Sequence, residues 1–256
     1  MFNTEAMGQF LEESLTSNSQ LCLGGVKIIL NEAMGGLVPS QAELNRQVFD
    51  AHKAGFQVAI HAITPNAVES AITALEYALK HLPYANRRHR LEHCSECPPG
   101  QLERLSKLQL IIVTQPSFVY YSGDRYLAKL PGSRLQYLYR IKSLMNAGLV
   151  VAGGSDSPVV SSNPLIGIYA AVTRRARTGQ VVLPEECISL NQALAMYTIN
   201  GAYASFEEGI KGSITRGKLA DVVMLGADLM KLPPEQIKDI RIEMTIIDGK
   251  IVWEAR

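Results

Sequence analysis

The sequence has few cysteines, no long apolar run and no excess of charge of either sign. Four cysteines among 256 residues are too few and too unevenly spaced for a disulfide framework; they are Cys22, Cys94, Cys97 and Cys187. The 25 Lys and Arg residues balance 24 Asp and Glu residues and are dispersed, so we expect neither a nucleic-acid nor a membrane partner. No apolar stretch approaches the roughly 20 residues that span a bilayer, and the opening segment does not resemble a secretory signal. A reducing, cytoplasmic location is the expectation.

The residues that are present form a regular rhythm of short apolar runs and amphipathic segments of helical length. The apolar runs predict strands over 26–30, 56–62, 110–115 and 149–156, and the rhythm places a further strand over 87–93, ending at His93. The segments between and after them predict helices over 40–55, 65–81, 98–109, 136–147, 164–177 and 189–205. Apolar strands buried on both faces and alternating with helices indicate an α/β fold with a parallel sheet and right-handed crossovers.

The pattern changes after Ser205. The last part of the chain predicts short strands, with Asp248-Gly249 as the turn of a hairpin. We therefore predict two domains, a β/α domain over 1–204 and a small β element over 205–256.

Four chemically interesting residues follow the β/α rhythm. Lys27, His61, His93 and Asp156 follow one another at intervals of 34, 32 and 63 residues. One βα unit of a barrel takes roughly 30 residues, so the intervals correspond to one, one and two units. In a β/α barrel, residues at the carboxyl ends of strands converge at one face. The spacing therefore predicts that these side chains meet.

Each of the four residues has a simpler interpretation when taken alone. A histidine after an apolar strand, such as His61 or His93, is more often a hydrogen-bonded structural residue. Asp156, followed by Ser157 and Pro158, could cap the next helix. Lys27 is harder to explain structurally, because a lysine in a buried strand is costly unless it is paired or modified.

The remaining histidines and the paired cysteines carry weaker signals. His52, His81 and His89 are not at strand ends and are interpreted as surface or structural residues. Cys94 and Cys97 have the spacing of half a zinc knuckle, but the sequence has no second cysteine pair or histidine pair to complete it. We expect them to be loop thiols beside the site.

Several segments together resemble the amidohydrolase superfamily, and within it the amidohydrolase 3 group of amide and formamide hydrolases. The segments are GGVKIIL, HRLEHC, IIVTQPSF, AGLVVAGGSDSP and the tail motif GSITRGKLAD. The resemblance implies a partial TIM (β/α) barrel, about strands four to eight, followed by part of a small C-terminal β-sandwich.

The resemblance also implies roles for individual residues. Lys27 corresponds to the strand-four lysine, which is often carboxylated into a metal-bridging ligand. His61 and His93 correspond to the histidine ligands of strands five and six. Asp156 corresponds to the strand-eight aspartate, which binds metal and shuttles the proton of the attacking water. The implied cofactor is a divalent metal, zinc or a similar ion, with one ion at most in this chain.

The sequence departs from the family pattern at several places. Family members open with a His-x-His motif at the end of strand one, and no such pair occurs here. Asn31-Glu32 and Thr64-Pro65-Asn66 replace the family's usual loop residues. We therefore expect the chain to correspond to the second half of a larger hydrolase. Three interpretations stay open: an incomplete amidohydrolase, a catalytically silent binding protein on the same scaffold, and a fragment of a longer gene product.

The sequence also suggests partners. Five strands cannot close an eight-stranded barrel, so we expect a homo-oligomer that covers the open sheet edges. A small amide-like molecule is the expected substrate, with Gln115, Tyr120 and Tyr121 as candidate contacts. Arg174 and Arg175 could meet a carboxylate, although a solvated helix face is the favoured interpretation.

Overall fold

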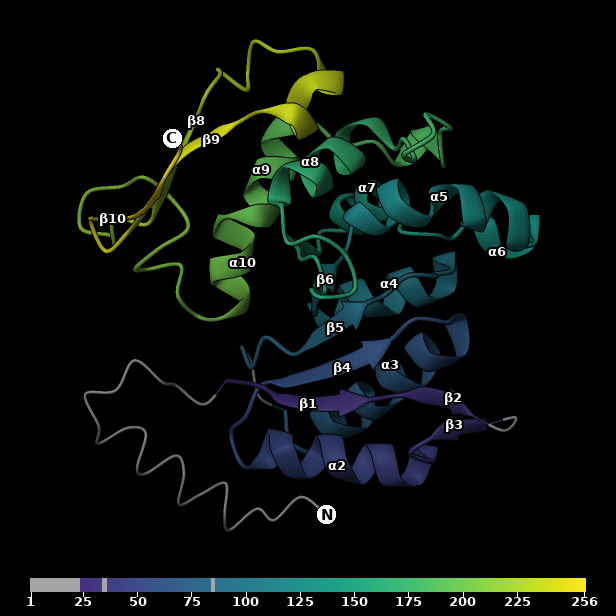
Figure 1. Cartoon of the computed structure of the whole chain (residues 1–256). Helices are drawn as coiled ribbons and strands as arrows, with labels where there is room; N and C mark the ends of the chain where they lie inside the picture. Colours follow the sequence, from purple (N-terminus) through teal and green to yellow (C-terminus); the bar gives the residue numbers. More distant parts are fainter. Residues whose placement is uncertain (1–23, 34–35, 84–85) are drawn as a thin grey trace.

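The computed structural model of the chain describes residues 24–33, 36–83 and 86–256 (Figure 1), so Cys22 lies outside the described residues. Its centre is a five-stranded parallel sheet in the order β1-β4-β5-β6-β7. These strands are Val26–Ile29, Val58–Ala62, Arg90–His93, Ile111–Thr114 and Val150–Gly153. At least one helix connects each strand to the next, as parallel pairing requires. The predicted α/β fold with a parallel sheet is confirmed. Within the described residues the sheet is open, with β1 and β7 at its edges.

The helices follow the strands closely in sequence. They are α2 (Gln41–Lys53), α3 (Pro65–His81), α4 (Pro99–Leu108), α5 (Ser117–Lys129), α6 (Gly132–Leu135), α7 (Ile141–Asn146), α8 (Pro164–Thr173), α9 (Leu190–Tyr197) and α10 (Ile199–Ala204). Two 3-10 turns, η1 (Pro184–Glu186) and η2 (Pro234–Asp239), lie in the later connections. A short hairpin of β2 (Asn31–Ala33) and β3 (Gly36–Val38) follows β1 and was not predicted. In the described part of the chain, no helix combines the length and the apolar character that crossing a membrane requires.

Local sequence explains where the main helices begin. The side chain of Ser40 accepts a hydrogen bond from the backbone of Glu43, which satisfies a free N–H in the first turn of α2. Thr64 caps α3 in the same way, and Pro65 at the first position of that helix has no N–H to satisfy. Ser189 and Gln192 form a reciprocal capping box at the start of α9.

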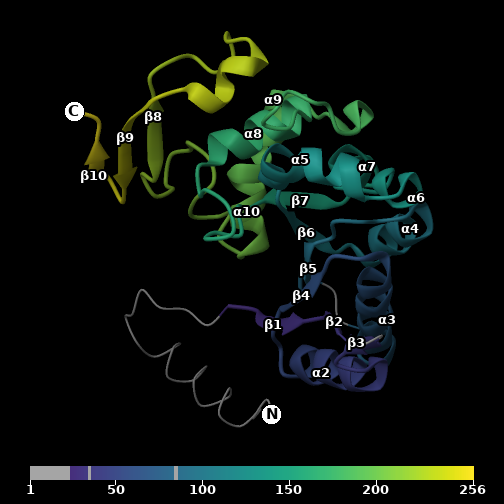
Figure 2. The ribbon, with the colours of Figure 1, turned by 45° about the vertical axis from the view of Figure 1, so that its right-hand side comes forward.

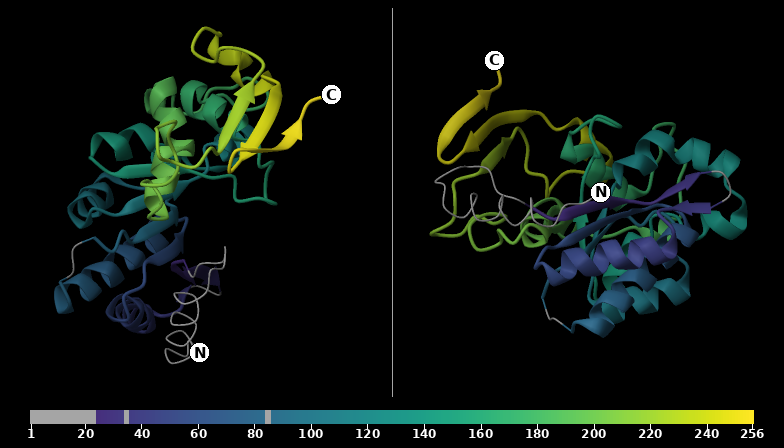
Figure 3. Two further views of the ribbon diagram at one scale, coloured as in Figure 1. Left: turned by 90° about the vertical axis from the view of Figure 1, so that its left-hand side faces the viewer. Right: turned by 90° about the horizontal axis from the view of Figure 1, so that it is seen from below.

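The core lies between the sheet and the helices that pack on one of its faces (Figure 3, right). On β1, Val26 and Ile28 are buried against this core, whereas Lys27 and Ile29 on the opposite face are exposed. The prediction that this strand is buried on both faces was wrong. The physical reason is that no described element covers the inner face of the edge strand, so successive side chains alternate between core and solvent.

The helices after β6 differ from the prediction, and the segment predicted as one helix over 136–147 is helical only over Ile141–Asn146 in α7. Residues after β6 that carry the tyrosines form α5, where no helix was predicted. The predicted helix over 164–177 ends at Thr173, because Arg174 adopts a left-handed conformation with φ of 54°. Arg174 is fully buried and donates to the carbonyls of Leu138, Tyr139 and Val182, so it is neither a solvated residue nor a carboxylate site. The predicted helix over 189–205 is divided into α9 and α10 at Thr198.

The last part of the chain forms an antiparallel sheet of β8 (Val222–Leu225), β9 (Ile242–Ile247) and β10 (Lys250–Glu254). It lies at the end of the molecule remote from α2 (Figure 2). Asp248 and Gly249 join β9 to β10 with φ of 50° and 72°, so the predicted hairpin turn is confirmed.

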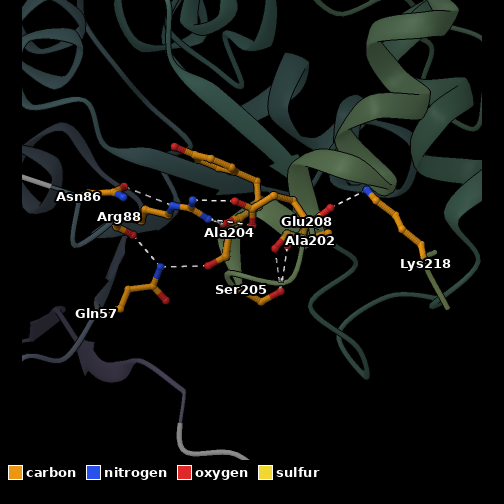
Figure 4. Close-up of polar contacts among 10 residues, drawn as sticks. Gln57, Asn86, Arg88, Ala202, Ala204, Ser205, Glu208 and Lys218 are labelled. Atoms are coloured by element: carbon orange, nitrogen blue, oxygen red, sulfur yellow. Dashed lines mark hydrogen bonds and ion pairs between the residues drawn. The ribbon is translucent and has the colours of Figure 1, made fainter. Parts of the chain in front are cut away.

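A polar cluster ties the end of α10 to the starts of β4 and β5 (Figure 4). Gln57 donates to the carbonyl oxygens of Arg88 (2.6 Å) and Ala204 (2.9 Å). The guanidinium of Arg88 forms a bidentate ion pair with Glu208 at 2.6 and 2.9 Å and lies 3.8 Å from the centre of the Tyr203 ring. Paired charge, a stacked ring and backbone carbonyls together hold the later segment against the sheet.

Candidate metal centre

The two predicted histidine ligands come together at the carboxyl ends of neighbouring strands. His61 is the fourth residue of the five-residue strand β4, and His93 is the last residue of β5. Their ring centres are 4.3 Å apart and the ring planes are inclined by 72°. The prediction that the β/α rhythm brings these two imidazoles together is confirmed.

The backbone of His93 departs from the regular strand. In the parallel register His93 pairs with Ala62, so the alternation of the strand would direct its side chain toward the helix-covered face, away from His61. Instead, His93 has φ of 74° and the following Cys94 has φ of 46°. A non-glycine residue in this region costs on the order of 1–3 kcal/mol and needs surrounding contacts to hold it. The left-handed turn is what allows the two rings to meet.

Strand ends on both sides of His93 supply those contacts. The hydroxyl of Thr114 donates to the carbonyl oxygen of His93 (2.8 Å). The backbone N–H of Cys94 donates to the carbonyl oxygen of Ala62 (3.0 Å). The ring itself is fixed, because its Nδ1 lies 2.8 Å from Oε1 of Gln115. Hydrogen bonds therefore hold both the backbone and the ring of a strained residue.

His61 is half-buried and electrostatically tuned toward its neutral form. Burial, followed by the proximity of His93 and of the Lys27 ammonium, lowers the pKa of His61 to about 4, while the Asp156 carboxylate acts in the opposite direction. Within the described residues, the His61 ring contacts the His93 ring edge-on, and no protein group forms a hydrogen bond with either of its nitrogens. A neutral imidazole with a free lone pair is the form that binds a metal ion.

Lys27 and Asp156 lie near enough to His61 for their charges to act on it, but neither is enclosed. Lys27 is exposed on the open face of β1, so the argument that it occupies a costly buried position is wrong. Asp156 is exposed and lies three residues beyond the end of β7. It does not cap the next helix, because Asn163 caps α8 by accepting from the backbone of Leu165 (3.0 Å).

The residues present fit a divalent ion as a two-histidine half-site. Two neutral imidazoles are ordinary ligands of zinc and of similar ions. In the part of the chain that the structure describes, no three His, Cys, Asp or Glu side chains are placed to hold an ion. A tetrahedral site would therefore need further donors, from Lys27 in modified form, from a moved Asp156 loop or from outside the described residues.

The other histidines and cysteines do not belong to this centre. Cys94 and Cys97 are buried, and the hydrogen bond between them, together with burial, raises the pKa of the Cys94 thiol. No third His, Cys, Asp or Glu side chain among the described residues joins this pair to hold an ion, which argues against a zinc knuckle. His52 and His89 form a buried pair with 2.9 Å between Nδ1 and Nε2, so they are structural, whereas His81 is exposed.

The predicted substrate contacts occupy different environments. Tyr120 and Tyr121 lie on α5, and the Tyr120 ring packs edge-on against Tyr169 of α8 at 5.8 Å between ring centres. Gln115 follows β6 and is buried, with its amide oxygen on His93. Sequence reasoning did not find this contact. The available signal was the position of Gln115, directly after the strand that neighbours β5.

The family model described as "Amidohydrolase family" matches residues 4–253. The chain belongs to the amidohydrolase family. Among curated members, it is 29% identical over 271 residues to "Putative amidohydrolase YtcJ" of Bacillus subtilis, covering 98% of this chain and 51% of that protein. It is 28% identical to the "N-substituted formamide deformylase" of Arthrobacter pascens, covering 84% of this chain and 40% of that protein. It is 32% identical to "Protein LONG AFTER FAR-RED 3" of Arabidopsis thaliana, covering 95% of this chain and 45% of that protein.

Solved structures of metal-dependent hydrolases share the fold. An uncharacterized metal-dependent hydrolase from Pyrococcus horikoshii has a TM-score of 0.75 at 24% identity, over 91% of this chain and 50% of that one. A second, from Pyrococcus furiosus, has a TM-score of 0.68 at 28% identity, over 84% of this chain and 47% of that one. This amidohydrolase chain thus spans about half the length of the relatives it matches.

Proposed function

We propose that this amidohydrolase is a metal-dependent hydrolase of non-peptide C–N bonds of the amide or formamide type. The observation that carries the proposal is the contact between the His61 and His93 rings, 4.3 Å apart at the ends of adjacent parallel strands. Family membership supports metal-dependent hydrolysis as the reaction class. The name of the Arthrobacter relative supports a formamide-like substrate.

In this proposal each residue has a defined task. His61 and His93 hold a zinc or similar ion through neutral nitrogens, and Lys27, in carboxylated form, and Asp156 supply oxygen donors. Such an ion, when bound, provides Lewis acidity that brings the pKa of a water molecule toward about 7. Asp156 accepts the proton of the attacking water and delivers it to the leaving nitrogen. Gln115, Tyr120 and Tyr121 contact the substrate.

Metal analysis of the purified chain tests the proposal. We expect bound zinc in stoichiometric amount by mass spectrometry of the elements, and its loss from His61→Gln and from His93→Asn. Asparagine is chosen for position 93 because it tolerates the left-handed backbone that His93 adopts. His81→Gln is the matched control, since His81 is exposed at the end of α3 and should leave the zinc content unchanged. Equal zinc in all four proteins would contradict the proposal.

One observation favours the alternative of a non-catalytic binding protein. The described residues contain no group of three His, Cys, Asp or Glu side chains suited to hold an ion. This alternative predicts a folded protein without zinc and without hydrolysis of N-substituted formamides at any zinc concentration. Hydrolysis that depends on zinc and disappears in Asp156→Asn would exclude it.

We further propose that the chain self-associates through the open edge of its parallel sheet. The edge strand β1 is unpaired on one side within the described residues, and its inner-face residue Ile29 is 52% exposed. Unpaired edges with exposed apolar side chains favour pairing with another chain. Light scattering at increasing protein concentration tests this, and a mass that stays at 28.0 kDa would argue against it.

A further inference from the structure

The contact between Gln115 and His93 is the most constrained polar interaction at the candidate metal centre. Gln115 Oε1 lies 2.8 Å from His93 Nδ1, and the two residues are only 3% and 4% exposed. They come from neighbouring strands, because β6 ends at Thr114 and β5 ends at His93. Water therefore has little access to this pair of atoms, so the hydrogen bond has no competing partner in solvent.

We propose that Gln115 is a positioning residue that sets the tautomer and the direction of the His93 ring. This inference rests on the proposed function, because it assigns His93 Nε2 as the atom that faces the metal ion. An amide oxygen can only accept, so His93 Nδ1 carries the proton and donates it to Gln115. In a neutral imidazole the other nitrogen, Nε2, then carries the free lone pair.

The orientation of the Gln115 amide decides which nitrogen of His93 carries the proton. The reversed orientation of the same amide would present its N–H₂ group to His93 Nδ1, which would then have to accept. The ring proton would then lie on Nε2, and this nitrogen would have no lone pair left to bind a metal ion. The two orientations of one amide therefore correspond to a site that can bind metal and a site that cannot.

The backbone of the same strand end supports the assignment. The Thr114 hydroxyl donates to the carbonyl oxygen of His93 at 2.8 Å, so the last residue of β6 holds the backbone of His93 and the residue after it holds the ring. This double attachment acts on a residue whose φ of 74° directs its ring out of the strand pattern and toward His61. Without the ring contact, the imidazole could rotate about its side-chain bonds while the strained backbone stayed in place.

Two substitutions and a matched control test the inference. Gln115→Met keeps the length of the side chain but has no acceptor for the Nδ1–H of His93. Gln115→Glu has a carboxylate, which can accept this hydrogen bond but cannot donate to Nδ1. Ser117→Ala is the control, because Ser117 is buried two residues away and its hydroxyl has no hydrogen-bond partner among the described residues. The tautomer of His93 is read from ¹⁵N–¹H correlation spectra of the metal-free protein, and zinc affinity from competition with a chromophoric chelator.

We expect the Nδ1–H tautomer of His93 in the unmodified protein, in Gln115→Glu and in Ser117→Ala. Gln115→Met should lose this preference and bind zinc about 10- to 100-fold more weakly, as is typical when an outer contact to a ligand histidine is removed. Gln115→Glu should restore the affinity. A role in folding alone would lower stability in Gln115→Met without changing the His93 tautomer.

The outcomes separate this inference from the proposed function. An Nε2–H tautomer in the unmodified protein overturns the inference even if Gln115→Met does not fold. Zinc affinity of Gln115→Met within twofold of the unmodified protein overturns it as well, provided that His93→Asn loses zinc. If His93→Asn keeps its zinc, the proposed metal site itself fails, whatever Gln115 does.

Discussion

Replacing His89 with glutamine should reduce the loss of stability that acid causes in this protein. His89 and His52 are 3% and 0% exposed and form a chain with backbone groups at both ends. The backbone N–H of Val58 donates to His89 Nδ1 (3.0 Å), and His52 Nε2 donates to the carbonyl oxygen of Leu82 (2.8 Å). His89 Nε2 must then donate to His52 Nδ1, across 2.9 Å. Every ring nitrogen is satisfied only when both rings are neutral, so an added proton has no acceptor.

The direction of the effect follows from the pKa of His89. Burial, followed by the nearby His52 and Arg87, lowers this pKa from 6.5 to about 3. As the pH falls through 6.5, His89 therefore takes up a proton in the unfolded chain but not in the folded chain. The stabilising contribution is complete above this value and is lost as the pH falls from 6.5 toward about 3. Between about pH 8 and about pH 5, linkage gives a loss of about 2 kcal/mol from this group.

Urea unfolding at a series of pH values measures this contribution. His89→Gln keeps a donor and an acceptor but cannot titrate, so its free energy of unfolding should fall by about 2 kcal/mol less than that of the unmodified protein over the same pH range. The comparison between the two proteins is essential, because the depressed pKa of His61 acts in the same direction. His81→Gln controls for the removal of an exposed histidine.

Parallel pH profiles for the unmodified protein and His89→Gln would refute the reasoning. They would mean that His89 titrates alike in the folded and unfolded chains, which a buried pair without a spare acceptor does not permit. If His89→Gln does not fold, the ring nitrogens of His89 can be followed by NMR in the unmodified protein. Protonation of His89 above about pH 6 in the folded state would contradict the argument equally.

Three further predictions concern stability. Gly167→Ala should lower the free energy of unfolding by about 1–3 kcal/mol, because its new Cβ would lie 1.8 Å from the Tyr197 hydroxyl. Gly132→Ala is the control, since a Cβ there meets nothing within 4 Å and should not lower the stability; thermal unfolding of both variants tests this. Arg88→Met should cost about 1–2 kcal/mol by removing its ion pair with the partly exposed Glu208, and an unchanged urea midpoint would count against this role. Under the proposed function, chelation should lower the melting temperature of the protein prepared with zinc and leave His61→Gln unaffected, which calorimetry can check.

The elements that could be predicted from the sequence are those with strong local signals. Helix α3 matches its predicted range because Thr64 and Pro65 mark its start and an apolar face runs along its length. The strand that carries His61 was found because it is a short apolar run. The strand that carries His93 is mostly polar, and its prediction depended on the regular alternation of strands and helices. Helix α5 was missed because its tyrosines and glycine gave no clear apolar period, and only packing against α8 explains it.

The candidate site was predictable in outline but not in detail. The interval between His61 and His93 reflects the length of a βα unit, which sequence spacing records directly. The left-handed backbone of His93 and the contact of its ring with Gln115 depend on neighbouring strands, and no local signal encodes them. The exposure of Lys27 depends on which chain segments cover the inner face of the sheet, which is likewise a property of the whole fold.

The left-handed turn at His93 has a consequence for how this fold can be altered. Because the two rings come from positions one step apart in the register, the left-handed backbone of His93 and Cys94 decides whether they face each other or lie on opposite sides of the sheet. A mutation that relaxed these two residues to ordinary strand geometry would leave the preceding residues of β5 in register with β4 and β6. It would separate the two histidines all the same, so under the proposed function a folded protein would lose its zinc although both ligand residues were still present.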